Sequence, residues 1–240
     1  MAEDTQTNES SDSRSQPVPV ADHVAPTEDL ALSQLSDRDL RTEVLEHIGR
    51  DAGLMKSRKV RIALASHPRA PRRIALRLIR ELYNFELMQF ALLPTAVADL
   101  KRLADEILIA RMASVTLGER VALARRSSEK VAGALLLDKE TRVWQTALQN
   151  SRLTEATVVR AVQRSGTAAF VEAVSRHAKW SLRAEVRVAL LRNAHTPLAR
   201  ALEFARRLAP GQLRDVLHTS RLPEKIKGYL RKELRERTGN

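Results

Sequence analysis

Cysteine is absent from this chain of 240 residues, and its absence removes several classes of protein. Without thiols there is no disulfide, no cysteine-ligated zinc or iron–sulfur cluster, and no thiol nucleophile. Aromatic residues make up only 3% of the chain, with 8 glycines and 9 prolines. Sheets concentrate β-branched and aromatic side chains, whereas small and aliphatic ones suit closely packed helices. The composition therefore predicts an all-α protein.

Long apolar runs are missing as well. No stretch approaches the roughly 18 apolar residues that a membrane-spanning helix requires. The N-terminus has neither the basic start nor the apolar middle of a signal peptide. We therefore expect a soluble, cytoplasmic protein.

Catalytic and cofactor motifs are also missing. The chain contains no Gly-rich phosphate loop, no HExxH, no nucleophile elbow and no kinase signature. The histidines are scattered, and we expect His67, His195 and His218 to lie in turns between paired helices. We predict no catalytic, cofactor-binding or metal-binding residues, and hence a protein that is not an enzyme.

The net charge of +12 is unevenly distributed. Residues 1–35 contain seven acidic residues and one basic residue, for a net charge of −6. Subtracting these from the 41 basic and 29 acidic residues of the chain leaves 40 and 22, a net charge of +18. Residues 1–34 are polar and predict a disordered acidic tail. Residues 35–240 form the predicted helical domain, whose basic character attracts anionic partners or merely solvates exposed faces.

Five stretches of this domain share one pattern, in which an Ala-Leu-like pair precedes a polar turn and a helix that opens on Pro or Thr. They begin at Val60, Val121, Val143, Val186 and Leu213. With a degenerate copy, the pairs recur at positions 63, 91, 122, 147, 189 and 216. The longest interval contains a further helix over 167–177, which we interpret as part of a degenerate unit. Such spacing is typical of solenoids and predicts about six helix–turn–helix repeats.

Two of these units resemble the HEAT-like and leucine-rich-repeat-variant helical repeats of bacterial proteins. In the first unit the resemblance is carried by Val60, Arg61, Ala65, Pro68, Pro71 and Leu76. In the second it is carried by Val186, Arg187, Asn193, Pro197 and Leu202. The resemblance implies a right-handed superhelix, over about residues 36–236, whose curved inner face binds a partner.

Basic residues recur at helical spacing in this domain. Arg73, Arg77 and Arg80 lie at i, i+4 and i+7, and Lys179, Arg183 and Arg187 lie at i, i+4 and i+8. The resemblance places the second helix of each pair on the concave side. The candidate surface for an anionic ligand consists of Arg72, Arg73, Arg77, Arg80, Arg160, Arg164, Lys179, Arg183, Arg187, Arg200 and Arg207. The alternative is that nearby glutamates neutralise these faces.

Three functional hypotheses follow. The leading one is a non-enzymatic scaffold or adaptor that binds a protein partner through its curved surface. Its rival is a nucleic-acid-binding module that contacts phosphates through a basic concave face. A third hypothesis is a HEAT-like DNA glycosylase, in which Trp144 and Trp180 would stack on a base and Asp138 or Glu185 would supply a carboxylate.

Overall fold

Residues 27–239, the part of the chain that the computed structural model describes, fold into helices joined by short turns, with no strand among them. The first helices are α1 (Glu28–Ser36), α2 (Thr42–Arg50), α3 (Arg58–Ser66), α4 (Arg72–Glu81), α5 (Asn84–Leu92), α6 (Ala98–Arg111), α7 (Leu117–Arg126) and α8 (Glu129–Leu135). They continue as α9 (Thr141–Leu148), α10 (Glu155–Arg164), α11 (Ala168–Arg176), α12 (Ala184–Arg192), α13 (Leu198–Arg206), α14 (Pro210–Thr219) and α15 (Glu224–Thr238). Short 3₁₀ helices lie at η1 (Leu54–Lys56), η2 (Met112–Ser114) and η3 (Trp180–Leu182). The predicted all-α fold is confirmed.

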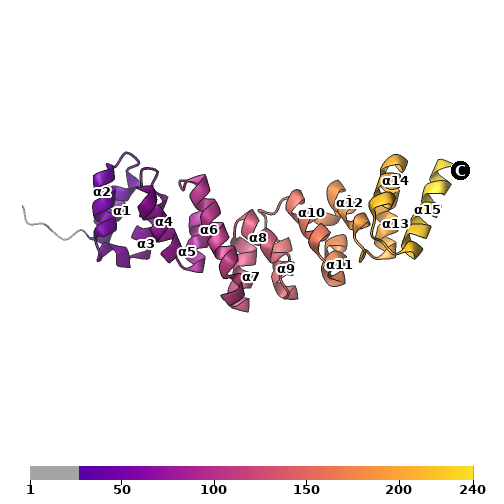
Figure 1. Ribbon diagram of the computed structural model, residues 1–240, viewed down its shortest axis with the longest axis horizontal. Coiled ribbons are helices and arrows are strands. Elements are labelled where there is room, and N and C mark those ends of the chain that lie inside the picture. Colours follow the sequence, from indigo (N-terminus) through magenta and orange to yellow (C-terminus); the bar gives the residue numbers. More distant parts are fainter. Residues whose placement is uncertain (1–26, 240) are drawn as a thin grey trace, which may run out of the picture.

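The helices stand in two rows along an elongated array, with α1 near one end and α15 at the other (Figure 1). In the first row, α1, α3, α5, α7, α9 and α11 each contact the next member, and α13 and α15 contact each other. In the second row, contacts join α4, α6, α8, α10, α12 and α14 in the same way. All substantial contacts therefore join helices that are one or two positions apart in the chain.

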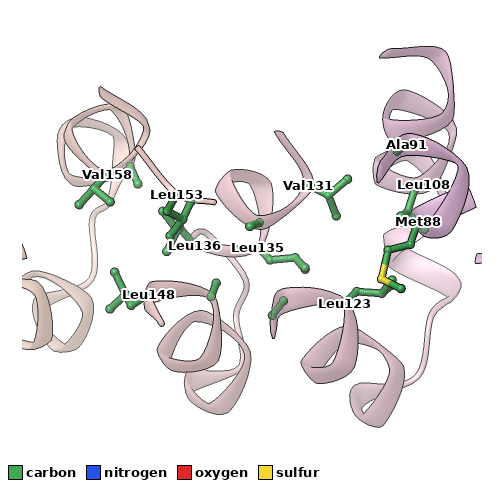
Figure 2. Close-up of a cluster of buried hydrophobic side chains, with 14 of the residues drawn as sticks. Met88, Ala91, Leu108, Leu123, Val131, Leu135, Leu136, Leu148, Leu153 and Val158 are labelled. Carbon is green, nitrogen blue, oxygen red and sulfur yellow. The ribbon is translucent and has the colours of Figure 1, made fainter. Parts of the chain in front are cut away.

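The hydrophobic core runs between the two rows. Figure 2 shows Leu123 of α7 and Leu148 of α9 on one side of it, with Leu135 of α8 and Val158 of α10 on the other. All four side chains are buried. The apolar positions of each helix thus face the opposite row, as an amphipathic helix requires.

The array begins earlier than the sequence predicts. We predicted a disordered tail over 1–34, and residues 1–26 of it lie outside the described residues. Residues 28–36 instead form α1, which contacts α3 and buries Ala31 and Leu35. Thr27 accepts a hydrogen bond from the amide of Leu30, and two acidic residues in the first turn favour the helix N-terminus. The few apolar residues of this stretch are enough to stabilise a helix, because α3 packs on it and buries them.

A repeated set of hydrogen bonds, which we call the turn network, joins successive helices within a row. Each member is a buried polar residue just after a helix, and its side chain donates to a backbone carbonyl at the end of the preceding helix in the same row. It also accepts from the amide two residues further on. The members are His67, Asn150, Asn193 and Ser220.

The two asparagines of the turn network make equivalent bonds. Asn150 Nδ2 donates to the carbonyl oxygens of residues 124 and 127, at 2.9 and 3.2 Å. Asn193 Nδ2 donates to those of residues 162 and 165, at 2.7 and 3.2 Å. Both Oδ1 atoms accept an amide hydrogen at 2.9 Å. These bonds satisfy helix-end carbonyls that lack an intrahelical partner.

The turn network changes rows in the middle of the array. His67 and Asn150 follow helices of the first row, whereas Asn193 and Ser220 follow helices of the second. The Ala-Leu-like pairs at 63, 91, 122 and 147 likewise lie in the first row, and those at 189 and 216 in the second. The long interval between 147 and 189 holds both α10 and α11, where each other interval holds a single full α-helix. The helix predicted over 167–177 is confirmed as α11. The interval holds one more helix than the others and not a further pair, so the Ala-Leu-like pairs after it lie in the other row.

Trp180 bridges this change of row. Its indole Nε1 donates to the carbonyl oxygen of Leu148, the last residue of α9, at 2.9 Å. Asn193 and Ser220 lie in the second row, so no later member of the turn network reaches α9 in the first row. The Trp180 indole donates to the end of α9 in their place. The ring itself is 1% exposed.

We expect Asn193→Ala to lower the free energy of unfolding by about 1–3 kcal/mol, because it leaves buried carbonyls without a donor. Urea denaturation of the purified chain measures this change. Gln149→Ala provides the control, since Gln149 is exposed and its side chain forms no hydrogen bond with the described residues. Equal effects of the two substitutions would contradict a stabilising role for the turn network.

A basic groove across the turns of α10, α12 and α14

The structure gives most of the predicted basic residues a partner inside the protein. Some pair with a carboxylate, some donate to a carbonyl or hydroxyl oxygen, and one lies over an aromatic ring. The residues with such a partner are Arg72, Arg73, Arg77, Arg160, Lys179, Arg187, Arg200 and Arg207. Much of the predicted anionic-ligand surface is therefore engaged in contacts within the fold.

The arginines of α4 join it to α2 and α6. Arg72 pairs with Asp99 of α6 at 2.5 Å, and this hydrogen bond lowers the pKa of Asp99. Arg73 pairs with Glu46 of α2 at 2.8 Å. Arg77 donates to a carbonyl oxygen at the C-terminal end of α2 at 3.0 Å. These side chains thus join α4 to both α2 and α6.

The predicted arginines of α12 and α13 also have internal partners. Arg187 donates to two carbonyl oxygens of η3, at 2.7 and 2.9 Å. Burial lowers the pKa of Arg187, and the positive charge of Arg207 lowers it further. Arg200 donates from Nε to the carbonyl oxygen of Ser175, at 2.8 Å, which ties α13 to α11. Arg207 pairs with Glu203 at 3.3 Å.

The remaining predicted residues are separated along the array. Arg80 lies on α4, Arg164 ends α10, and Arg183 precedes α12. None of the three side chains forms an ion pair within residues 27–239. Lys179 and Arg183 lie on either side of η3, outside α12, so they do not form a single helical stripe with Arg187. The structure does not bring these predicted residues together.

Arg164 instead lies with two arginines that the sequence analysis did not single out. A cavity of about 460 Å³ is lined by Arg164 from the end of α10, Arg192 from the end of α12, and Arg221 from the turn after α14. We call this cavity and its lining the basic groove. Gln163 and His195 also line it.

The charge of the basic groove is not balanced locally. The three guanidinium groups are exposed, and none takes part in an ion pair among the described residues. Asp and Glu are absent from the residues that line the groove. Guanidinium groups bind carboxylates and phosphates through paired N–H donors. The geometry therefore favours an anionic ligand at this place.

The turn network positions the groove. Arg164 and Arg192 are the last residues of α10 and α12, each one position before the helix cap. Asn193 joins the ends of these two helices, and the amide of Arg221 donates to the carbonyl oxygen of Arg192 at 3.1 Å. Arginine at a helix C-terminus also offsets the helix dipole, by about 0.3–1 kcal/mol. The helix dipole explains why an arginine is favourable at the end of one helix, but it does not explain why three arginines line one cavity.

A neighbouring cavity between α8 and α10 has a different charge. Arg160, another predicted residue, lines this cavity of about 350 Å³ together with Glu129, Lys130 and Arg164, so Arg164 borders both cavities. Glu129 accepts hydrogen bonds from Thr154 and Thr157, and these bonds lower its pKa. Arg160 donates to the Thr157 hydroxyl at 2.9 Å. A carboxylate held in its charged form makes this cavity less suited to an anion than the basic groove.

Three of the four residues of the glycosylase hypothesis lie in the core or in an ion pair, and the fourth, Glu185, is exposed at the start of α12. Trp180 and Trp144 are 1% and 5% exposed, and Trp144 packs edge-on against Phe170 with the ring centroids 5.5 Å apart. Asp138 pairs with Arg120 at 2.7 Å. Neither tryptophan presents a ring to a nucleobase, which such an enzyme needs for stacking.

The histidines show no common site. His67 and His195 lie in turns, as predicted, but His218 lies within α14. Among residues 27–239, no group of three or more His, Asp and Glu side chains is arranged to hold a metal ion. In the same range no helix has the length and apolarity to cross a membrane.

The described residues thus form an all-α protein whose helices stand in two rows. The basic groove lies at the ends of α10, α12 and α14 in the second row. Comparison of the chain with family models, curated proteins and solved structures finds no match. The resemblance to HEAT-like and leucine-rich-repeat-variant proteins therefore stays a prediction, which rests on the residues of the two repeat units.

Proposed function

We propose that the chain is an α-solenoid that serves as a non-enzymatic adaptor for a protein partner. The observation that carries the proposal is the pattern of helix contacts. Each helix packs mainly on helices one or two positions away, in two rows that extend along one direction (Figure 1). Stacked helical repeats of this kind leave long continuous faces available to a partner.

The distribution of charged contacts supports a protein partner over a nucleic acid. A protein that grips nucleic acid without reading its sequence needs many free basic side chains along the phosphate backbone. Here most of the predicted basic residues are engaged inside the fold. The exposed large apolar side chains include Tyr83, Phe85 and Leu182, which are the residue types that contribute to protein interfaces.

The proposal predicts that the purified, tagged chain captures a defined set of proteins from native lysate, and that the set survives nuclease treatment. Mass spectrometry of the bound fraction, with the tag alone as the control, measures this. Because the proposed binding faces exist only in the folded array, a second control uses the chain unfolded in urea and then immobilised. This unfolded chain should not capture the same set of proteins. Capture that disappears with nuclease would instead indicate a nucleic-acid-binding protein.

A further inference from the structure

We infer that the basic groove binds an acidic polypeptide segment, whose carboxylates pair with Arg164, Arg192 and Arg221. The inference rests on the proposed adaptor function and assigns the chemistry of one contact with the partner. It depends on the meeting of three exposed guanidinium groups in one cavity whose lining contains no Asp or Glu.

An acidic ligand would gain more at this groove than elsewhere on the described surface. Some exposed arginines of the array already have partners, so an incoming carboxylate must compete with Asp99 at Arg72 or with Glu46 at Arg73. Other arginines, such as Arg125, Arg142 and Arg214, form no ion pair among the described residues but do not meet in this cavity. At the groove there is no such competitor. Carboxylates of the ligand would replace water around Arg164 and its neighbours with charge-assisted hydrogen bonds.

The size and lining of the groove fit a polypeptide. Its volume of about 460 Å³ lies within the roughly 300–1,000 Å³ range of ligand clefts, enough for a few residues of an extended segment. Gln163 and Thr219 lie among the arginines and offer groups that hydrogen-bond to a peptide backbone. The groove thus offers arginines for the acidic side chains of a short segment and neutral polar groups for its backbone amides.

A single-stranded nucleic acid fits this groove less well. Proteins that bind such strands combine a continuous basic track with aromatic side chains on which bases stack. No aromatic residue lines the groove. The next cavity along the row is lined by Lys130, Arg160 and Arg164 but also by the carboxylate of Glu129. A nucleic-acid strand would therefore find phosphate contacts but no ring on which its bases could stack.

The groove is held in shape before any ligand binds. Asn193 and Ser220 of the turn network fix the ends of α10, α12 and α14 relative to one another. The main-chain bond from residue 221 to residue 192 does the same for two of the arginines. A preformed site loses less entropy on binding, so even a few ion pairs can give measurable affinity.

Fluorescence anisotropy with a labelled polyglutamate peptide of about ten residues tests the inference on the full chain. We expect the affinity to fall as salt rises, because exposed ion pairs are screened. Charge reversal in the variant Arg164→Glu, Arg192→Glu, Arg221→Glu should weaken binding by about tenfold or more, because three attractions become repulsions. The neutral variant with glutamine at the same three positions should lie between this variant and the unmodified chain.

A matched control separates the groove from the general basic charge. Arg125, Arg142 and Arg214 are exposed, form no ion pair among the described residues and line none of the cavities described above. Reversing these three changes the net charge equally and should weaken binding by less than about threefold. Equal loss in both triple variants, or no binding by the unmodified chain, would overturn the inference. Circular dichroism checks that both variants remain helical, and the glutamine variant decides the outcome if the reversed one unfolds.

A second probe distinguishes the two kinds of anionic partner. A labelled oligothymidylate of similar charge should bind more weakly than polyglutamate and should lose less affinity in the groove variant. Tighter oligothymidylate binding that the groove variant abolishes would overturn the assignment to an acidic polypeptide. The adaptor proposal is tested separately, because capture of protein partners by the groove variant would leave that proposal standing while removing this one.

Discussion

Trp180→Ala is expected to lower the free energy of unfolding by about 3–5 kcal/mol, which is the usual effect of truncating a buried tryptophan. The ring is almost fully buried, and its Nε1 donates to the carbonyl oxygen of Leu148 in a distant part of the chain. The substitution therefore removes apolar contact and a buried hydrogen bond together. Urea denaturation followed by circular dichroism measures the loss.

Trp180→Phe separates the two contributions. Phenylalanine retains much of the apolar surface but has no N–H group, so the carbonyl oxygen at the end of α9 loses its donor. We expect a loss of about 1–3 kcal/mol from the unsatisfied carbonyl, in addition to the effect of the smaller ring. A change below about 0.5 kcal/mol in both variants would mean that Trp180 does not join the two halves of the array.

Asp138→Asn is expected to lower the free energy of unfolding by about 3–5 kcal/mol, because it leaves a buried cation without its counter-ion. Arg120 of α7 donates from one nitrogen to both carboxylate oxygens of Asp138, at 2.8 and 2.7 Å. The side chains are only 14% and 7% exposed. Asp138 also accepts the amide hydrogen of Glu140 at the start of α9, so the pair fixes α9 against α7.

A double-mutant cycle tests this pair. Arg120→Met and Asp138→Leu should each destabilise the chain when made alone, whereas the double variant that carries both should recover much of the loss, because no buried charge remains. The exposed pair Lys130–Glu106, whose side chains are 45% and 60% exposed, provides the comparison. Glu106→Gln should change the free energy of unfolding by no more than about 1 kcal/mol. Strictly additive effects at Arg120 and Asp138 would contradict the proposed coupling.

Most of the basic residues predicted to bind an anion are engaged within the fold, because helical spacing does not show which side chains already have partners. Arg73 and Arg77 do lie on one face of α4, but a carboxylate and a carbonyl of α2 occupy them. Arg192 and Arg221 have no partner of this kind, yet neither stands in a regular basic stripe. Their shared feature is proximity to Asn193 and Ser220, residues of the turn network. A search for basic residues next to buried polar turn positions would have found them.

The sequence by itself determined the helical class and much of the periodicity, because both depend on local composition and on the spacing of apolar residues. The Ala-Leu-like pairs at positions 63, 91, 122 and 147 all lie in helices of the first row, and those at 189 and 216 lie in helices of the second row. Only the tertiary structure decided that α11 is a single extra helix, so that equivalent helices change rows after α9. It also decided which arginines are free, because that depends on partners about 25–30 residues away in neighbouring helices. The spacing of residues in the sequence shows which side chains share a face of a helix. Only the packing of the helices determines which partners that face contacts.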